Sequence, residues 1–371
     1  MAGIVADCKL STRFAIATDA DEAAIRRLLR DNPMHGAISL SFEREPDYSR
    51  GMNLAGGSDQ TVLAYANSQV VGMGRCTQRD CWLNGAARNT GYLGELRLDA
   101  TVRGRYGILR DGYSHLLAMQ REAPADFYFT SIAADNGRVR RLFENETRGL
   151  PHYGFLAELD TLLITVPRNP RAVRLRVVTA TPSHIPDMIH LLNSPQQQLA
   201  AVWTAERLLS LDKHDLPLSR FRLAFDGAQL VGCGALWDQR QFRQTVIRGY
   251  SRALGIARPL LNFVGRIVGT PRLPPVNSVL AHAFLSPLAM ARHAENRLPE
   301  FIESFLTLAS QSGIEFLTLA LPSDDARLPA LRKRYTTRTW RSRLYRVDWP
   351  EFTPLKIHTK GAVFLPDVAL L

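Results

Sequence analysis

The 371-residue sequence is poor in cysteine, and its cysteines are not spaced as metal ligands. The four cysteines are Cys8, Cys76, Cys81 and Cys233, and they include no CxxC pair and no neighbouring cluster of histidines. Structural zinc sites depend on such closely spaced thiolates and imidazoles. We therefore expect no metal site, and so few cysteines favour a reducing compartment.

Long apolar runs are also missing. No run approaches the roughly 20 apolar residues that a helix needs to cross a bilayer. The first ten residues, MAGIVADCKL, lack the basic start and the apolar core of a signal peptide. We expect a cytoplasmic location without insertion into a membrane.

Two common nucleotide-binding motifs are absent as well. There is no GxGxxG fingerprint and no glycine-rich loop ending in Gly-Lys-Ser/Thr, so dinucleotide-binding and Walker-type sites are disfavoured. Acidic residues are the scarcer charge, because 46 Lys and Arg stand against 35 Asp and Glu, a net charge of +11. This excess favours an anionic partner such as a phosphorylated cofactor, an acidic substrate, a nucleic acid or a lipid headgroup.

The sequence repeats one design twice. In residues 13–29, Phe14 and Ile16 alternate as on a short strand, and Thr18 can form a capping box with Asp21 before an amphipathic helix. Residues 174–192 show the same order, with Thr181 as the expected cap and Pro182 in the first turn. Two units of similar structure are therefore predicted.

A second pair of segments supports duplication. LAYANSQVVGMG (63–74) aligns without a gap with LAFDGAQLVGCG (223–234), and each is typical of a hairpin. YLGELRLDAT (92–101) and VLAHAFLSPL (279–288) form a weaker third pair. We predict domains at 1–168 and 169–371, joined by the proline-bearing stretch 166–174, in a mixed α/β (α+β) fold with a central, mostly antiparallel mixed sheet and flanking helices in each domain.

The second half carries an insertion at about 239–278 that contains seven arginines and no Asp or Glu. An arm over the first domain, an anion-binding surface and a basic solvent-exposed face are all compatible with this composition.

The segment ELRLDATVRGRYGI (95–108) ends an alternating strand in a basic, glycine-rich turn before a helix. Amide groups at the start of a helix are unpaired, and the helix dipole favours an anion there. Gly104 and Gly107 allow close approach of a ligand to the backbone, while Arg103 and Arg105 can bind phosphate. The segment therefore suits a pyrophosphate held beside an extended strand.

These features resemble the GNAT superfamily of acyl-CoA-dependent N-acyltransferases, from Arg13 to about Pro167. The resemblance implies a cofactor arm between two splayed strands, a pyrophosphate on the next turn, and acetyl-CoA as the expected acyl donor. At the two positions where the family's loop pattern has glycine or alanine, this sequence has Tyr106 and Ile108, so the match to the pattern is partial. The cofactor-binding residues that the resemblance implies are Leu96, Arg97, Leu98, Arg103, Gly104, Arg105, Tyr106, Gly107, Ile108 and Asn136.

Acyl transfer to an amine requires a group that takes the amine's proton and an acid for the leaving thiolate. The resemblance assigns the base to Glu95, with an ion pair to Arg97 as the alternative. Family members commonly use a tyrosine as the acid for the thiolate, but Phe143 occupies that position in this sequence. Tyr153 is the candidate that could take over the role. Segment 285–297 of the second half has no glycine, so we expect a degenerate domain that shapes the acceptor cleft.

The expected function is N-acyl transfer to an amine of a small molecule or peptide. One alternative is a catalytically inactive CoA-binding, regulatory or scaffold protein with the same fold. The other is a basic nucleic-acid-binding protein using the insertion and residues 332–346, which we disfavour because arginines on final strands are commonly surface residues. The acceptor and the oligomeric state do not follow from the sequence.

Overall fold

The computed structural model describes residues 12–371 except 146, 195, 269–271 and 354. The first half forms β1 (Thr12–Ile16), α1 (Glu22–Asp31), β2 (Ile38–Glu43), β3 (Ser58–Ala66), β4 (Gln69–Leu83), β5 (Ala86–Leu98), α2 (Tyr106–Gln120), β6 (Phe127–Ala133), α3 (Gly137–Glu144) and β7 (His152–Thr165). The second half forms β8 (Arg176–Thr179), α4 (Ile185–Leu192), β9 (Gln197–Gln198), α5 (Ala205–Ser210), β10 (Phe221–Asp226), β11 (Gln229–Trp237), β12 (Gln244–Tyr250), α6 (Arg252–Val268), β13 (His282–Met290), α7 (Leu298–Gln311), β14 (Phe316–Pro322), α8 (Leu328–Arg334), β15 (Thr337–Asp348) and β16 (Val363–Phe364).

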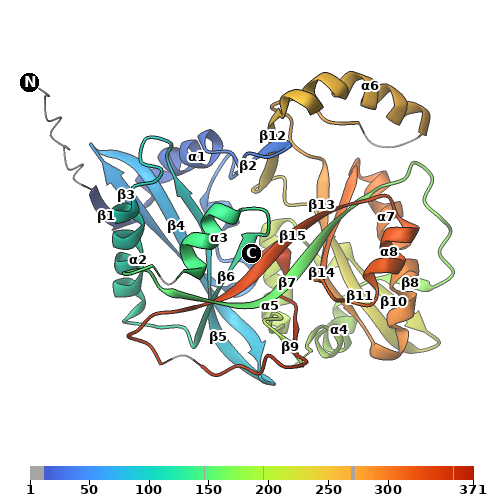
Figure 1. The fold of residues 1–371 in the computed structure, drawn as a ribbon. Coiled ribbons are helices and arrows are strands. Elements are labelled where there is room, and N and C mark those ends of the chain that lie inside the picture. The colour runs from blue at the N-terminus through green and yellow to red at the C-terminus, as the bar shows by residue number, and fades with distance from the viewer. Residues whose placement is uncertain (1–11, 146, 195, 269–271, 354) are drawn as a thin grey trace, which may run out of the picture.

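One twelve-stranded sheet runs through both halves, in the order β1-β3-β4-β5-β6-β15-β7-β14-β13-β11-β10-β8 (Figure 1). Read inward from its two ends, the sheet repeats the same pattern. Each half has three antiparallel steps followed by one parallel step, β5–β6 in the first half and β13–β14 in the second. This arrangement confirms the predicted mixed α/β fold with a repeated order of elements.

The halves exchange their last strands at the centre of the sheet. β15, from the end of the chain, lies between β6 and β7 of the first half, while β7 pairs with β14 of the second half. The division at residue 168 therefore follows the repeat in the sequence and does not coincide with a break in the sheet.

Local sequence signals fold as expected at the start of each half. Thr18 and Asp21 form the capping box, and the Thr18 amide donates to the Asp21 carboxylate at 2.9 Å. Thr181 forms a corresponding box with His184. At the first hairpin Asn67 and Ser68 both have positive φ, 49° and 63°, as a tight two-residue turn requires.

Helices cover both faces of the first half's strands. Val62 of β3 packs in a cluster with Leu109 and Tyr113 of α2, whereas its neighbour Leu63 packs with Ile25 of α1. Successive residues of a strand point to opposite faces, so α2 and α1 lie on opposite sides of the sheet. Both faces of these strands are therefore covered by helix.

The arginine-rich insertion forms β12 and α6. β12 pairs antiparallel with β2 of the first half, so the insertion bridges the two halves. α6 projects from the body of the molecule (Figure 1). No helix in the described part of the chain is both long enough and apolar enough to cross a membrane.

Candidate active site

The two central strands of the first half separate after three residue pairs. β5 and β6 pair in parallel only from Thr90–Phe127 to Tyr92–Phe129. β5 then continues to Leu98 and β6 to Ala133 without pairing with each other. The separation leaves a cleft at the carboxyl ends of these strands, as the resemblance to the GNAT superfamily implies.

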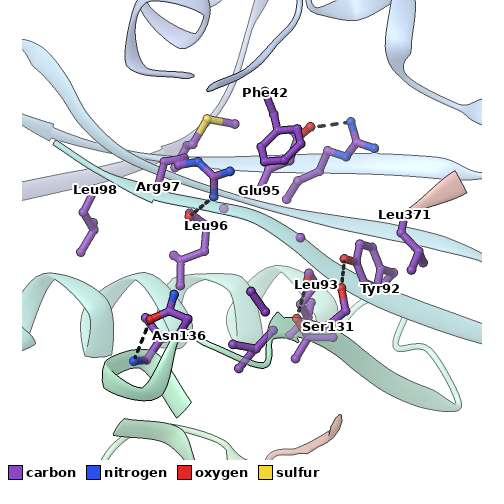
Figure 2. Close-up of a pocket in the computed structure, with 18 of the residues that line it drawn as sticks. Phe42, Tyr92, Leu93, Glu95, Leu96, Arg97, Leu98, Ser131, Asn136 and Leu371 are labelled. Carbon is purple, nitrogen blue, oxygen red and sulfur yellow. Dashed lines mark hydrogen bonds and ion pairs between the residues drawn. The ribbon is translucent and has the colours of Figure 1, made fainter. Parts of the chain in front are cut away.

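A β-bulge lies on β5 beside this cleft. Arg75 of β4 pairs with Gly94 and Met73 pairs with Arg97, so Glu95 and Leu96 together oppose a single residue. Glu95 has φ of 52°, a left-handed conformation that is uncommon for residues other than glycine. Bulges redirect side chains locally, and this one places Glu95 and Leu96 on opposite sides of the strand (Figure 2).

A cavity of about 490 Å³ passes through the cleft. Its first part, which we call the helix side, faces α2 and α3 and is lined by Leu93, Leu109, Ile132, Asn136 and Tyr153. Its second part, the arginine side, lies across β5 and is lined by Arg44, Arg75, Glu95, Arg97 and Arg243. This volume is in the range of ligand pockets, and the two sides differ strongly in polarity.

The turn before α2 is open to a ligand. Gly104 has φ of 94°, which the absence of a side chain permits. Arg105 does not cap α2 with its side chain, the first turn has no acidic residue, and a Cβ on Gly107 would meet nothing within 4 Å. Among the described residues, the amides of Gly104, Tyr106 and Gly107 have no hydrogen-bond acceptor outside the helix. The predicted anion-binding turn is therefore not occupied by the protein's own groups.

The basic side chains of this turn differ in their contacts. Arg103 donates to Asn32 Oδ1 at 2.9 Å, while Arg105 is exposed. The Tyr106 hydroxyl donates to the carbonyl of Arg148. Arg138 of α3, which sequence reasoning did not single out, reaches within 3.6 Å of where a Cβ on Gly104 would lie. The turn thus receives positive charge from its own arginines and from α3, and the buried Ile108 anchors it.

Asn136 and Tyr153 both reach the helix side of the cavity. Asn136 caps α3, and its side chain accepts from the Val139 amide at 3.3 Å. The Tyr153 hydroxyl lies 2.5 Å from that of Tyr113, and its ring stacks on Phe143 with 4.2 Å between centroids. Burial first, and then the neighbouring Tyr113, raise the pKa of Tyr153 well above its ordinary value. Tyr153 is therefore protonated at neutral pH.

Glu95 is held on the arginine side by three groups far from it in sequence. It forms an ion pair with Arg44, lies 3.7 Å from Arg75 Nη1, and accepts from the Tyr48 hydroxyl at 3.0 Å. Burial alone would raise the pKa of this carboxyl, but the charges of Arg44 and Arg75 outweigh burial and hold it well below its ordinary value. Glu95 is therefore ionised throughout the neutral range.

Arg97 does not form the direct ion pair with Glu95 that we considered as the alternative. Its Nη1 donates to the carbonyl of Leu96 at 2.9 Å (Figure 2). Leu96 and Leu98 line the cavity with it, and Leu98 pairs with Gly72 of β4. The end of β5 thus borders the cavity with both its backbone and its side chains.

The second half contributes to the wall of the arginine side. Arg243, Phe284 and Leu371 line the cavity, and Arg243 donates to the carbonyls of Leu371 and Ala369, the latter at 3.1 Å. Burial, and then the like charge of Arg44, lower the pKa of Arg243 to about 9. Two distant parts of the second half thus meet beside Glu95.

The corresponding space in the second half is filled. Gly74 lines the cavity, and a Cβ there would lie 4.0 Å from Leu96, whereas at the corresponding Gly234 a Cβ would lie 3.1 Å from Leu288 and from Phe305. Phe305 belongs to a buried core cluster that covers β13 and β14. Aromatic side chains of α7 therefore occupy the space that is open beside α2.

Sequence reasoning missed Arg44, Arg75, Tyr48 and Arg243, which gather around Glu95. Their positions give no local signal, because they lie between 20 and 148 residues from Glu95 in the chain. A run of alternating apolar residues around Arg75 could have indicated a strand residue facing inward, but not its partner. In the described part of the chain, no group of three His, Cys, Asp or Glu side chains is arranged to hold a metal ion.

No protein-family model matches this sequence, and no curated protein matches it in sequence. Solved structures match its fold. A GCN5-related N-acetyltransferase from Sphaerobacter thermophilus aligns with a TM-score of 0.54 over 94% of this chain and 98% of its own, at 13% identity. N-myristoyltransferase from Saccharomyces cerevisiae, solved with bound myristoyl-CoA, aligns with a TM-score of 0.60 over 95% of this chain and 88% of its own, at 9% identity. The chain therefore has the GNAT fold.

Proposed function

We propose that this protein is an N-acyltransferase that uses acyl-CoA, with acetyl-CoA as the expected donor. The observation that carries the proposal is the cleft between β5 and β6, which opens beside a turn with unpartnered amides. The amides around Gly104 and Gly107 suit the pyrophosphate, with Arg105 and Arg138 beside them. The pantetheine arm then lies along Leu96–Leu98, next to Asn136.

This placement brings the thioester to the bulge on β5. The acceptor nitrogen attacks the thioester carbonyl carbon, the C–S bond breaks, and the amine gives up one proton. Glu95 receives that proton through water and releases it to solvent, because its low pKa does not let it hold a proton, and Tyr153 later regains a proton from solvent. Tyr153 is our candidate for the acid that protonates the leaving thiolate, since its raised pKa keeps its hydroxyl protonated.

The filled second half supports a single cofactor site. The turn after β13 contains no glycine, and Phe305 occupies the neighbouring space. We therefore propose that the second half serves as a wall of the acceptor site, through Arg243 and Phe284, and that acyl-CoA binds in a ratio of one per chain.

Calorimetry with the full chain tests the proposal. We expect acetyl-CoA to bind at one site per chain, and a panel of amines to release the CoA thiol from it. Octanoyl-CoA and myristoyl-CoA in the same titration establish the acyl length. No binding of any of the three would overturn the proposal. Binding without thiol release on any amine would favour an inactive CoA-binding protein.

A further inference from the structure

Four arginines meet on the arginine side of the cavity with too few carboxylates to balance them. Arg75 pairs with Asp59 at 3.2 Å, and Arg44 pairs with Glu95. Among the described residues, Arg97 and Arg243 have no carboxylate side chain as a partner. Four arginines thus face two carboxylate side chains, which leaves two positive charges without compensation. A backbone carboxylate at Leu371 would neutralise one of them and leave the other.

Several guanidinium donors in this cluster are buried and unused. Arg44 Nε, Arg44 Nη1 and Arg75 Nη1 have no hydrogen-bond partner among the described residues, although Arg44 is only 3% exposed. A buried donor without an acceptor is destabilising by about 1–3 kcal/mol, and more for a charged group. An anionic ligand in the cavity would supply acceptors for such donors.

The position of the arginine cluster relative to the turn before α2 indicates which substrate would supply this anion. The open turn at Gly104 and Gly107 takes the phosphates of acyl-CoA in our proposed function, and it borders the helix side. The arginine side lies across β5 and is left for the acceptor. Glu95 attracts the acceptor's ammonium group, whereas Arg97 and Arg243 would repel an acceptor that carried only positive charge.

We infer that the acceptor is an amine that also carries an oxyanion, bound by the four arginines of the arginine side while its nitrogen lies at Glu95. Carboxylate and phosphate share this chemistry, and an amino acid is the simplest molecule with both groups. This inference rests on the proposed acyl transfer for the role of the site, but oxyanion binding itself does not depend on turnover.

Matched acceptors test the inference on the full chain. Phenylalanine is compared with phenylalaninamide, and phosphoethanolamine with ethanolamine, at pH 8 with acetyl-CoA. The amide has the lower amine pKa and hence the larger fraction of free amine at pH 8, so preference for the acid has to come from the protein. We expect kcat/KM at least about 10-fold higher for the anionic member of one pair, and the preferred pair identifies carboxylate or phosphate.

Arg97→Met is expected to remove this preference by raising KM for the anionic acceptor about 10-fold or more, while KM for its neutral counterpart changes little. Arg88→Met is the control, because Arg88 lies on the same strand and is exposed outside the cavity. Calorimetric binding of N-acetylphenylalanine against its amide, without acyl-CoA, gives a readout independent of catalysis. Equal binding of both, together with equal binding of phosphoethanolamine and ethanolamine, would overturn the inference. If acyl-CoA does not bind but the acid is still preferred, the proposed function fails and the oxyanion site stands.

A second inference concerns the outer face of α6. Ile256, Leu260 and Phe263 are 75%, 67% and 61% exposed, and Val264 is also exposed. Their spacing puts them on one face of the helix. The polar residues Arg258 and Asn262 instead face the protein, where both donate to the carbonyl of Leu273 at 3.2 Å. α6 is therefore attached by its polar face and presents its apolar face outward.

We propose that this face rests on an anionic lipid surface. The helix has no acidic residue, and the exposed Arg252 and Arg272 flank it, which complements negatively charged headgroups. An apolar face with flanking arginines and no acid is typical of helices that lie in the membrane interface. Such binding is peripheral and requires no helix that spans the bilayer.

Vesicle co-sedimentation of the full chain tests this surface. We expect binding to vesicles with 30% phosphatidylglycerol that is at least about 10-fold stronger than binding to pure phosphatidylcholine. Leu260→Glu with Phe263→Glu should abolish it, and Leu209→Glu, on the exposed part of α5, should not. Absence of binding to the anionic vesicles would overturn the proposal. So would a dimer in analytical ultracentrifugation that the double variant dissociates, because α6 would then cover a second copy.

Discussion

Gly107→Glu is expected to weaken acetyl-CoA binding by at least about 30-fold while leaving the protein folded. A Cβ at this position meets no other atom, so the new side chain fits without a clash. Its carboxylate would lie where we place the pyrophosphate, and juxtaposed like charges cost about 2 kcal/mol or more, which is a factor of about 30 in affinity. Calorimetric titration measures the change.

Gly107→Gln is the matched control for this substitution. Glutamine has nearly the same shape without the charge, so the difference between the two variants isolates electrostatic repulsion. Both substitutions remove a glycine from the first turn of α2, and in the Glu variant the helix dipole also favours the negative charge. We therefore expect neither variant to unfold at a lower temperature than the unmodified protein. Equal affinity of the Glu and Gln variants for acetyl-CoA would contradict the position that we assign to the pyrophosphate.

Glu95→Gln is expected to lower kcat about 100-fold. This is the lower end of the contribution of a general base, and we choose it because the low pKa of Glu95 makes it a weak base. KM for acetyl-CoA should change little, since the substitution does not alter the turn before α2. The same change removes a partner from Arg44 and Arg75, and breaking a buried ion pair costs about 3 kcal/mol of unfolding free energy. Thiol-release kinetics and urea unfolding measure the two effects.

Asp59→Asn separates catalysis from stability. Asp59 also pairs with Arg75 but does not line the cavity, so this variant should lose stability and keep kcat within about threefold. A large fall in its kcat would mean that the network positions the site and that Glu95 has no direct role.

The pH dependence of stability provides a further check on Glu95. Its folded pKa lies below the unfolded value of about 4.3, so its contribution is complete above that pH and is lost as pH falls toward the folded pKa. The free energy of unfolding of Glu95→Gln should therefore fall less steeply below pH 4.5 than that of the unmodified protein.

Local patterns in the sequence were sufficient to predict much of the fold. The capping boxes at Thr18 and Thr181 depend on residues three positions apart, and the repeat 63–74 with 223–234 carries its own turns. The open turn before α2 was likewise predictable, because glycine, arginine and a helix start occur together at 103–107; that it binds an anion stays a prediction.

Long-range pairing could not be predicted in this way. Periodicity indicates that 337–348 is a strand but does not say which strand is its neighbour, so the place of β15 between β6 and β7 was missed. The same limit applies to Glu95. Arg97 is close in sequence, but the ion pair forms with Arg44, which the loop after β2 brings from 51 residues away.

The crossing of β7 and β15 has a mechanical consequence. A cut in the connection between Thr165 and Arg176 would leave two fragments that each hold a strand inside the other's portion of the sheet. The two fragments would stay associated under native conditions. A hinge motion that separates the two portions would have to break the backbone hydrogen bonds between neighbouring strands. Access to the cavity is therefore expected to depend on movements of loops and side chains, because the shared sheet resists a hinge between the two halves.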